Sequence, residues 1–299
     1  MEELVSVIMP AYNAEKYIYM SIASVMQQTY RNVELVIVDD GSTDTTLEIM
    51  KECVRRWPDK IRIFSRAQNG GTAAALNDAI EMAEGKYICW LSADDLYCDD
   101  MVESEVSYLK QNKGCDAVFS KCAFIDGDSQ LLGSQQFVVD EVNFSYGMPR
   151  IVHLLLLLNF WHGCTLLAKA ECFKREDRFN VNFRASQDYD FWLRMAADYN
   201  IGYLNQITVM SRRHSGQGSR VLNCRLDEII VFFSILYRED IMIKLFRKME
   251  KPYTYENIKP YIAYRMEKYE GLEEEMNAIA RGVKGYLDRM EKGALHFQN

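Results

Sequence analysis

Short apolar runs alternate with helical patterns over the first hundred residues, and this alternation limits the possible fold more than any other feature. Strand-like runs rich in β-branched residues lie at 4–9, 33–38, 61–64 and 87–91, with helical spacing of apolar residues between them. Strand–helix alternation with short links favours right-handed crossovers and a sheet covered by helices on both faces. We therefore predict an α/β fold with a mostly parallel, Rossmann-like sheet.

Capping residues mark where the predicted helices begin and end. Asn13 is the predicted N-cap of the first helix, and Ser42-Thr43-Asp44 is the predicted cap of the second. A third helix over 72–83 is predicted to end at Gly85.

Beyond residue 112 the alternation loosens. The runs 117–124 and 131–139 flank Asp126-Gly127-Asp128, which predicts a hairpin. A buried helix is predicted at 152–158, a short strand at 165–168 and another helix at 188–199. After roughly residue 220 the pattern is helical throughout.

Composition and charge exclude several classes of protein. With 48% hydrophobic and 26% charged residues the chain fits a soluble globule, and its net charge of −8 argues against nucleic-acid binding. The eight cysteines show no metal-like spacing, so we expect reduced, packed thiols such as Cys164 in a cytoplasmic protein. The start of the chain has no signal-peptide pattern, and His153, His162 and His296 suggest nothing beyond ordinary structural histidines.

Polar residues follow each predicted strand, which is where a parallel sheet binds its ligands. The four clusters are Pro10-Ala11-Tyr12-Asn13, Asp39-Asp40-Gly41-Ser42, Asn69-Gly70-Gly71-Thr72 and Ser92-Ala93-Asp94-Asp95. The sequence therefore predicts one ligand site along this edge of the sheet.

Asp94 and Asp95 are adjacent carboxylates after a buried strand. Their mutual repulsion is removed by a divalent cation, and hard oxygen ligands suit Mn²⁺ or Mg²⁺. The alternative is that Asp95 simply caps the next helix. The pair taken alone leaves both interpretations open.

The other strand-end clusters suit a nucleotide but also have structural interpretations. Asp39 and Asp40 could hold a base edge or a ribose hydroxyl, form a turn with Gly41, or divide these tasks between them. Tyr12 could stack on a base or merely pack, and the Gly-Gly pair at 70–71 allows close backbone approach at a helix start. No G-x-G-x-x-G follows the first strand, which counts against a nicotinamide or flavin enzyme.

Two clusters in the second half carry further candidates. Asp188 opens an aromatic-rich helix, where it could act as a general base or simply favour the helix dipole. His214 could complete a metal shell, and Arg212 and Arg213 could neutralise phosphate; a solvated loop is the structural alternative.

In the order of these motifs and in their residues, the chain resembles family 2 glycosyltransferases, the inverting group with the GT-A fold, over roughly residues 4–220. The run Val-Ser-Val-Ile-Met-Pro-Ala-Tyr-Asn at 5–13 matches that family's opening strand and donor loop. Val-Asp-Asp-Gly-Ser-Thr-Asp at 38–44 matches its second loop.

The resemblance implies a role for each matched residue. The residues at nucleotide-binding positions are Pro10, Ala11, Tyr12, Asp40, Asn69, Gly71 and Asp94. The residues at the position of a divalent metal (Mn²⁺ or Mg²⁺) are Asp94, Asp95 and His214, and the catalytic base is Asp188. It also implies a GT-A catalytic domain over 1–220, with a nucleotide-binding half at 1–112 and an acceptor half at 113–220. Residues 221–299 would form a helical C-terminal extension.

Two residues depart from the family pattern. Ser92 stands where many members carry the first aspartate of the metal motif, and Gln187 stands where many carry a glutamate before the base. The expected activity is transfer of a sugar from a nucleotide diphosphate sugar, with UDP the commonest nucleotide in the family, to a saccharide or lipid-linked acceptor in polysaccharide or glycoconjugate synthesis. A catalytically impaired nucleotide-sugar-binding module and a nucleotidyltransferase are the alternatives.

The segment 236–249 leaves the role of the extension open. It combines apolar Ile241, Leu245 and Phe246 with basic residues such as Lys244 and Arg247. It could lie on the inner face of an anionic membrane, pack on the catalytic domain, or pair with a second subunit in a homodimer.

Overall fold

The computed structural model describes residues 2–134, 147–217, 224–268, 277–278 and 281–289. Its elements follow one another as β1 (Val5–Ala11), α1 (Ile18–Met26), β2 (Val33–Asp39), α2 (Thr46–Arg56), β3 (Ile61–Ser65), α3 (Thr72–Met82), β4 (Tyr87–Trp90), β5 (Leu96–Tyr97), α4 (Met101–Gln111), β6 (Ala117–Ile125), β7 (Leu131–Ser134), α5 (Met148–Leu157), η1 (Gly163–Thr165), β8 (Leu166–Lys169), α6 (Ala170–Phe173), α7 (Gln187–Asp198), β9 (Ile201–Arg212), α9 (Cys224–Leu236), α10 (Glu239–Lys248) and α11 (Tyr255–Lys268).

One mixed sheet forms the centre of the molecule, in the order β3-β2-β1-β4-β8-β6-β9-β5, with β7 paired to β6. Strands β1 to β4 are parallel, β8 runs antiparallel to both of its neighbours, and β6 is again parallel to β9. The α/β fold with a mostly parallel first half is therefore confirmed.

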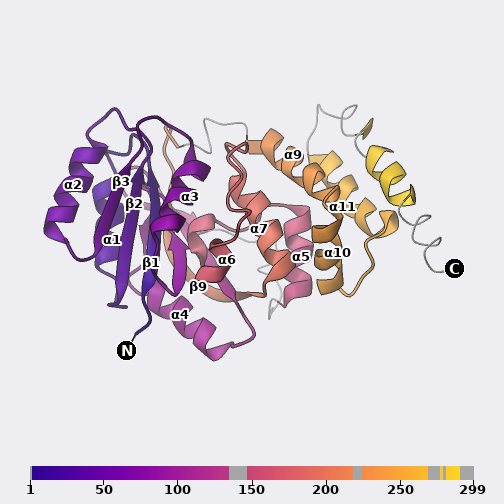
Figure 1. Cartoon of the computed structure of the whole chain (residues 1–299), viewed down its shortest axis with the longest axis horizontal. Helices are drawn as coiled ribbons and strands as arrows, with labels where there is room; N and C mark the ends of the chain where they lie inside the picture. The colour runs from indigo at the N-terminus through magenta and orange to yellow at the C-terminus, as the bar shows by residue number, and fades with distance from the viewer. Residues whose placement is uncertain (1, 135–146, 218–223, 269–276, 279–280, 290–299) are drawn as a thin grey trace.

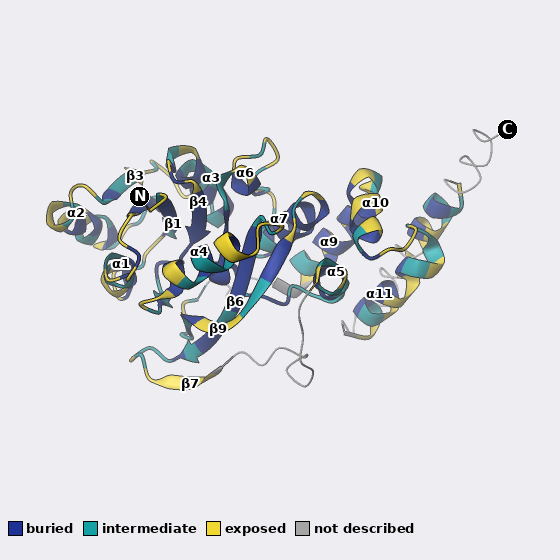
Figure 2. Cartoon of the chain, turned by 90° about the horizontal axis from the view of Figure 1, so that it is seen from below, coloured by how far each residue is buried: buried dark blue, intermediate teal, exposed yellow. Residues whose placement is uncertain are grey.

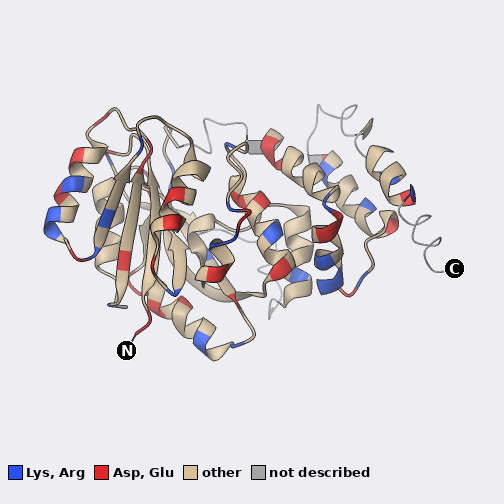
Figure 3. Cartoon of the chain, in the orientation of Figure 1, with Lys and Arg blue, Asp and Glu red and all other residues tan. Residues whose placement is uncertain are grey.

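The strand order reverses at β1, and this reversal places helices on both faces of the sheet. Right-handed connections put α1 and α2 together on one face and α3 on the other, as Figures 1 and 2 show. Strand β2 is buried along its whole length, as expected for a strand covered on both faces. Figure 3 shows the charged residues mainly on helices and loops, with few on the strands.

Helices α9, α10 and α11 pack against α5 and α7 rather than standing apart from the sheet domain (Figure 1). The apolar face of α10 turns inward, because Ile241, Leu245 and Phe246 are buried. This apolar face therefore packs on the rest of the described chain, as one of the alternatives for this segment predicted. No helix in the described ranges is both long and apolar enough to cross one.

Of the two helix caps predicted from the sequence, the first is wrong. Asn13 does not cap α1, which begins after Tyr17; it adopts φ 48° and its Oδ1 accepts a hydrogen bond from the Thr43 amide at 2.8 Å. Asp44 does serve the start of α2, by accepting from the Thr46 amide at 3.0 Å.

The hairpin predicted at Asp126-Gly127-Asp128 is confirmed, since β6 and β7 pair antiparallel on either side of it. Residues 135–139 of its predicted second strand lie outside the described residues, as does His296.

Candidate functional site

The second strand-end loop shows how the two neighbouring carboxylates Asp39 and Asp40 divide their tasks. Asp39 accepts hydrogen bonds from the Ser42 amide at 3.1 Å and the Ser65 hydroxyl at 2.8 Å, which fixes the turn after β2. Asp40 accepts from the amides of Gly70 at 2.9 Å and Gly71 at 2.7 Å. One aspartate therefore makes the turn, and the other ties this loop to the loop before α3.

Asp40 is also neutralised by a cation that the sequence analysis did not single out. The Arg66 Nε lies 3.0 Å from the Asp40 Oδ1, and the Arg66 side chain also pairs with Asp78. Asp40 is only 3% exposed, so its first role is to hold the loop in place. The Oδ1 of Asp40 faces both the Gly70 amide and Arg66, so Oδ2 is the carboxylate oxygen that keeps a second lone pair for a ligand.

The first and third loops leave surface free for a flat ligand and its phosphates. Tyr12 is 49% exposed, whereas Ala11 before it is buried. Gly71 caps α3 with φ 87°, and a side chain there would meet nothing within 4 Å. The start of α3 thus faces open space, and the backbone conformation at Gly71 is one that favours glycine.

Asp94 and Asp95 face different surroundings. Asp94 remains partly exposed, and its Oδ2 lies 2.9 Å from the Nε2 of His214. Asp95 is 1% exposed, and its Oδ1 accepts a hydrogen bond from the Arg212 amide at 2.7 Å. The predicted association of His214 with this pair therefore involves Asp94, while Asp95 anchors the end of β9.

Behind Asp95 lie Cys164 and His162, two residues outside the predicted site. The Cys164 Sγ and the His162 Nε2 each lie 3.6 Å from the Asp95 Oδ2. Cys164 is buried, but its thiol also lies 3.3 Å from the hydroxyl of Ser92, so its surroundings are polar rather than apolar. These contacts join segments about seventy residues apart, which no local pattern reveals.

Burial governs the protonation of this group. Burial, together with the neighbouring Asp94, raises the pKa of Asp95 to about 8. Burial lowers the pKa of His162 to about 4 and raises the pKa of the Cys164 thiol well above its usual range. His162 is therefore neutral at pH 7, and Cys164 is a thiol rather than a thiolate.

A divalent cation fits the oxygen and nitrogen donors that remain accessible. Asp94 and His214 offer a carboxylate and an imidazole on the exposed side, a donor set suited to Mn²⁺. Within the described ranges, three potential ligands also gather at Asp95, His162 and Cys164. That second group lies largely in the interior, whereas Asp94 and His214 are both partly exposed, so the accessible pair fits better.

Arg212 is not the free phosphate-binding cation that the sequence suggested. It is fully buried, and its guanidinium donates to the carbonyls of Asp94 at 2.9 Å and Asp126 at 2.9 Å. The same guanidinium lies over the ring of Tyr17, 4.6 Å from its centroid. Arg212 therefore holds the loop of Asp94 and Asp95 against the β6–β7 hairpin.

Asp188 lies in the first turn of α7, as predicted. Its Oδ2 accepts a hydrogen bond from the Asn159 amide group at 3.2 Å, and its Oδ1 accepts from the Tyr189 backbone amide at 2.7 Å. Burial outweighs these hydrogen bonds and raises its pKa to about 6. Asn159 was missed because a lone asparagine after a helix carries no sequence signal.

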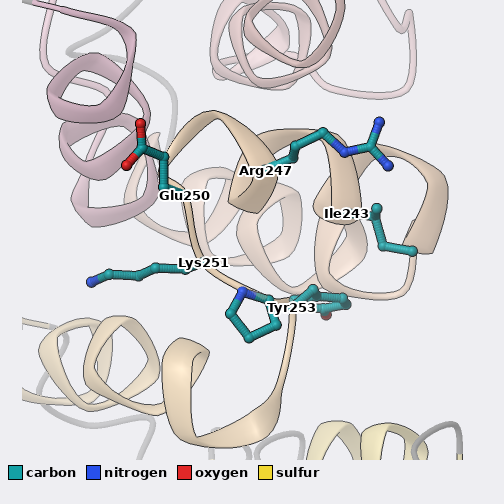
Figure 4. A pocket seen from close by; sticks show the side chains of 6 residues that line it. Ile243, Arg247, Glu250, Lys251 and Tyr253 are labelled. Atoms are coloured by element: carbon teal, nitrogen blue, oxygen red, sulfur yellow. The ribbon is translucent and has the colours of Figure 1, made fainter.

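Two surface hollows lie elsewhere and are lined by none of these residues. One, of about 540 Å³, lies between α1 and α2 around Tyr19 and Cys53. The other, of about 300 Å³, lies at the turn between α10 and α11, where Figure 4 shows Arg247, Lys251 and Tyr253. Neither contains a carboxylate of the predicted site.

Comparison with known proteins identifies the family. The family model for "Glycosyl transferase family 2" matches residues 6–170, which is more than half of the chain. The chain belongs to glycosyl transferase family 2. This confirms the resemblance that the two opening motifs carry.

Two curated relatives show the range of this family. An uncharacterized glycosyltransferase of Rickettsia bellii is 33% identical over 81% of this chain and 35% of its own length. The Escherichia coli protein WfgD, described as a UDP-Glc:alpha-D-GlcNAc-diphosphoundecaprenol beta-1,3-glucosyltransferase, is 30% identical over 72% of this chain and 79% of its own length. The chain spans only 35% to 41% of the length of three Rickettsia relatives.

Solved structures agree on the fold. A crystal structure of Staphylococcus aureus TarS residues 1–349 in complex with UDP-GlcNAc has a TM-score of 0.68 at 19% identity, covering 97% of this chain and 92% of that one. The Pyrobaculum calidifontis mannosyltransferase PcManGT, in complex with GDP-Man and Mn²⁺, has a TM-score of 0.59 at 17% identity, covering 95% and 81%. The similarity to TarS extends over the C-terminal helices as well as the sheet.

Proposed function

We propose that this family 2 glycosyltransferase moves a sugar from a UDP-sugar to a hydroxyl of a lipid-linked saccharide, with inversion and with a divalent metal. The observation that carries the proposal is the Asp188 carboxylate in the first turn of α7, which hydrogen bonds from Asn159 and the Tyr189 amide hold in place. Burial raises its pKa to about 6. A carboxylate with such a pKa is mostly ionised at neutral pH, yet is a stronger base than an ordinary aspartate.

The donor nucleotide lies along the strand ends. Tyr12, which is half exposed, stacks on the base, with Pro10 and Ala11 forming the strand end behind it. Asp40 contacts the base or ribose while holding the loop of Asn69 and Gly71, and the open space before α3 receives polar donor groups. WfgD takes UDP-Glc and TarS binds UDP-GlcNAc, which supports UDP as the nucleotide.

The metal is held by Asp94 and His214, with Asp95 fixing the loop from behind. When bound, the cation stabilises the negative charge that grows on the departing diphosphate. The Mn²⁺ in PcManGT supports this choice of ion. The Arg212 guanidinium donates a 2.9 Å hydrogen bond to the Asp94 carbonyl. This hydrogen bond keeps the loop that carries Asp94 next to the end of β9.

Asp188 takes the proton from the acceptor hydroxyl as that oxygen attacks the anomeric carbon from the face opposite the nucleotide. One displacement of this kind inverts the anomeric centre. Asn159 holds one carboxylate oxygen and the Tyr189 amide holds the other, so the base is oriented before the acceptor arrives.

The proposed acceptor is a lipid-linked saccharide. WfgD acts on a diphosphoundecaprenol-linked sugar, which supports a lipid-linked saccharide acceptor. With such an acceptor the chain would work at a cytoplasmic membrane face, in polysaccharide synthesis. A homodimer through the C-terminal helices stays a prediction.

Substituting Asp188→Asn tests the function. We expect transfer to fall by about 10²–10⁴-fold, the usual contribution of a general base, while UDP-sugar and Mn²⁺ still raise the melting temperature as in the wild type. Asp59→Asn, at an exposed position, is the matched control. Full transfer by the Asp188 variant would refute the assignment, and donor binding without transfer by the wild type would favour the impaired binding module.

A further inference from the structure

The C-terminal helices place a fully buried arginine against the helix that carries Asp188. Arg265, on α11, is 0% exposed, and its guanidinium donates to the hydroxyl of Tyr189 on α7. The same guanidinium pairs with the Glu228 carboxylate of α9 at 3.5 Å and lies over the Tyr189 ring, 5.1 Å from its centroid. Three helices, two of them from the extension, therefore meet at one charged group.

A buried arginine is costly unless it is well partnered, so its position requires a specific set of contacts. Tyr189, which it contacts, is itself fully buried and donates a hydrogen bond from its hydroxyl to the Leu155 carbonyl at 2.6 Å. The backbone amide of the same Tyr189 donates to the Asp188 carboxylate at 2.7 Å. Arg265 is thus two contacts away from the proposed base.

Helix α9 reaches the same region from another side. The Asp227 carboxylate accepts a hydrogen bond from the Ala185 amide at 2.9 Å, in the segment just before α7. Glu228 acts on Asp188 through its charge, which raises the pKa of that carboxyl further after burial has done so. Around Asp188, the groups that act on it are therefore Asn159, the Tyr189 amide and Glu228, with Arg265 behind Tyr189 and beside Glu228.

We propose that Arg265 and Glu228 are positioning residues for Asp188, so that helices α9 and α11 are part of the acceptor half rather than an appendage to it. The inference rests on the proposed role of Asp188 as the base. Through Tyr189, Arg265 fixes the first turn of α7. Glu228 fixes Arg265 and places a negative charge near the base.

The test compares Arg265→Met, Arg265→Lys, Glu228→Gln and the control Lys259→Met, an exposed position on the same α11. With UDP-sugar and acceptor we expect Arg265→Met to lower kcat by up to about 10²-fold, the scale of a misplaced catalytic group, without raising the KM for the donor. Arg265→Lys restores part of that loss. Glu228→Gln moves the acidic limb of the pH profile to lower pH, and Lys259→Met changes neither quantity.

Thermal unfolding of each variant separates folding from positioning. If Arg265→Met does not fold, the acidic limb of Glu228→Gln still decides, because that side chain is partly exposed. An unmoved limb in Glu228→Gln, or an equal change in donor KM and kcat in Arg265→Met, would overturn the inference. Inactive wild type, or active Asp188→Asn, would instead overturn the proposed function, so the two failures are distinguishable.

Discussion

Replacing Asn159 with alanine should lower the transfer rate more at acidic pH than at alkaline pH. Asn159 donates to the Asp188 carboxylate at 3.2 Å, and this hydrogen bond favours the ionised form and so lowers the pKa of Asp188. Its loss raises that pKa above its value of about 6. The base works only when ionised, so the acidic limb of activity moves to higher pH.

The size of the shift follows from the strength of one hydrogen bond. A net value of about 0.5–1.5 kcal/mol corresponds to about 0.4–1.1 pKa units, since one unit is about 1.4 kcal/mol. At pH 6 the ionised fraction then falls by about two- to sevenfold, whereas near pH 8.5 it hardly changes.

The assay measures the initial transfer rate at saturating donor and acceptor between pH 5 and pH 9. The control is Asn182→Ala, at an exposed position before α7. A loss of equal size at every pH would refute the reasoning, because Asn159 would then act on geometry alone. An unmoved limb would refute it as well.

Three further predictions concern the nucleotide and metal side of the site. His214→Ala should raise the Mn²⁺ concentration for half-maximal transfer by about tenfold or more, whereas His153→Ala should leave it unchanged, as a metal titration will show. Tyr12→Ala should weaken UDP binding by about 1–3 kcal/mol in calorimetry, with Tyr12→Phe retaining most of it and the melting temperature little changed, because the side chain is half exposed. Burial raises the pKa of Asp95 to about 8 in the folded protein, so the free energy of unfolding of the metal-free protein should fall as pH rises from about 4 to about 8. Thermal melts of Asp95→Asn should lack that part of the decline. An equal fall of the melting temperature with pH in both proteins would contradict the raised pKa of Asp95.

Local patterns predicted the elements that depend on local information. Strands β1 to β4 and helices α2 and α3 were each predicted within a few residues, because buried parallel strands and capped helices leave a clear apolar period. The strand β5 has two residues and is too short to show such a period. Polar Asn205 and Gln206 interrupt the apolar pattern of β9. The cap predicted at Asn13 was wrong because its side chain serves the next loop along the sheet edge instead.

The site was predicted as a set of positions, but not as a set of contacts. Strand-end position alone brought Asp40 and Gly71 to one edge, and the structure places them in contact at 2.7 Å. The partners of Asp95 come from β9 and η1, and the partner of Tyr189 comes from α11, 76 residues along the chain. Such contacts depend on how distant elements pack. The apolar period of an element does not indicate which other elements it packs against.

The pair Asp94–Asp95 shows why two adjacent carboxylates need not share one role. Along a chain leaving a strand, successive side chains point to different sides, so one of the pair turns toward the ligand edge when the other turns into the core. Asp95 is buried and its carboxylate accepts a hydrogen bond from the Arg212 amide, so it is less accessible to a cation than its neighbour. Asp94 is partly exposed beside His214. Hence the prediction of a metal at the pair narrows to Asp94 as the ligand, with Asp95 as the group that holds the ligand-bearing loop to β9.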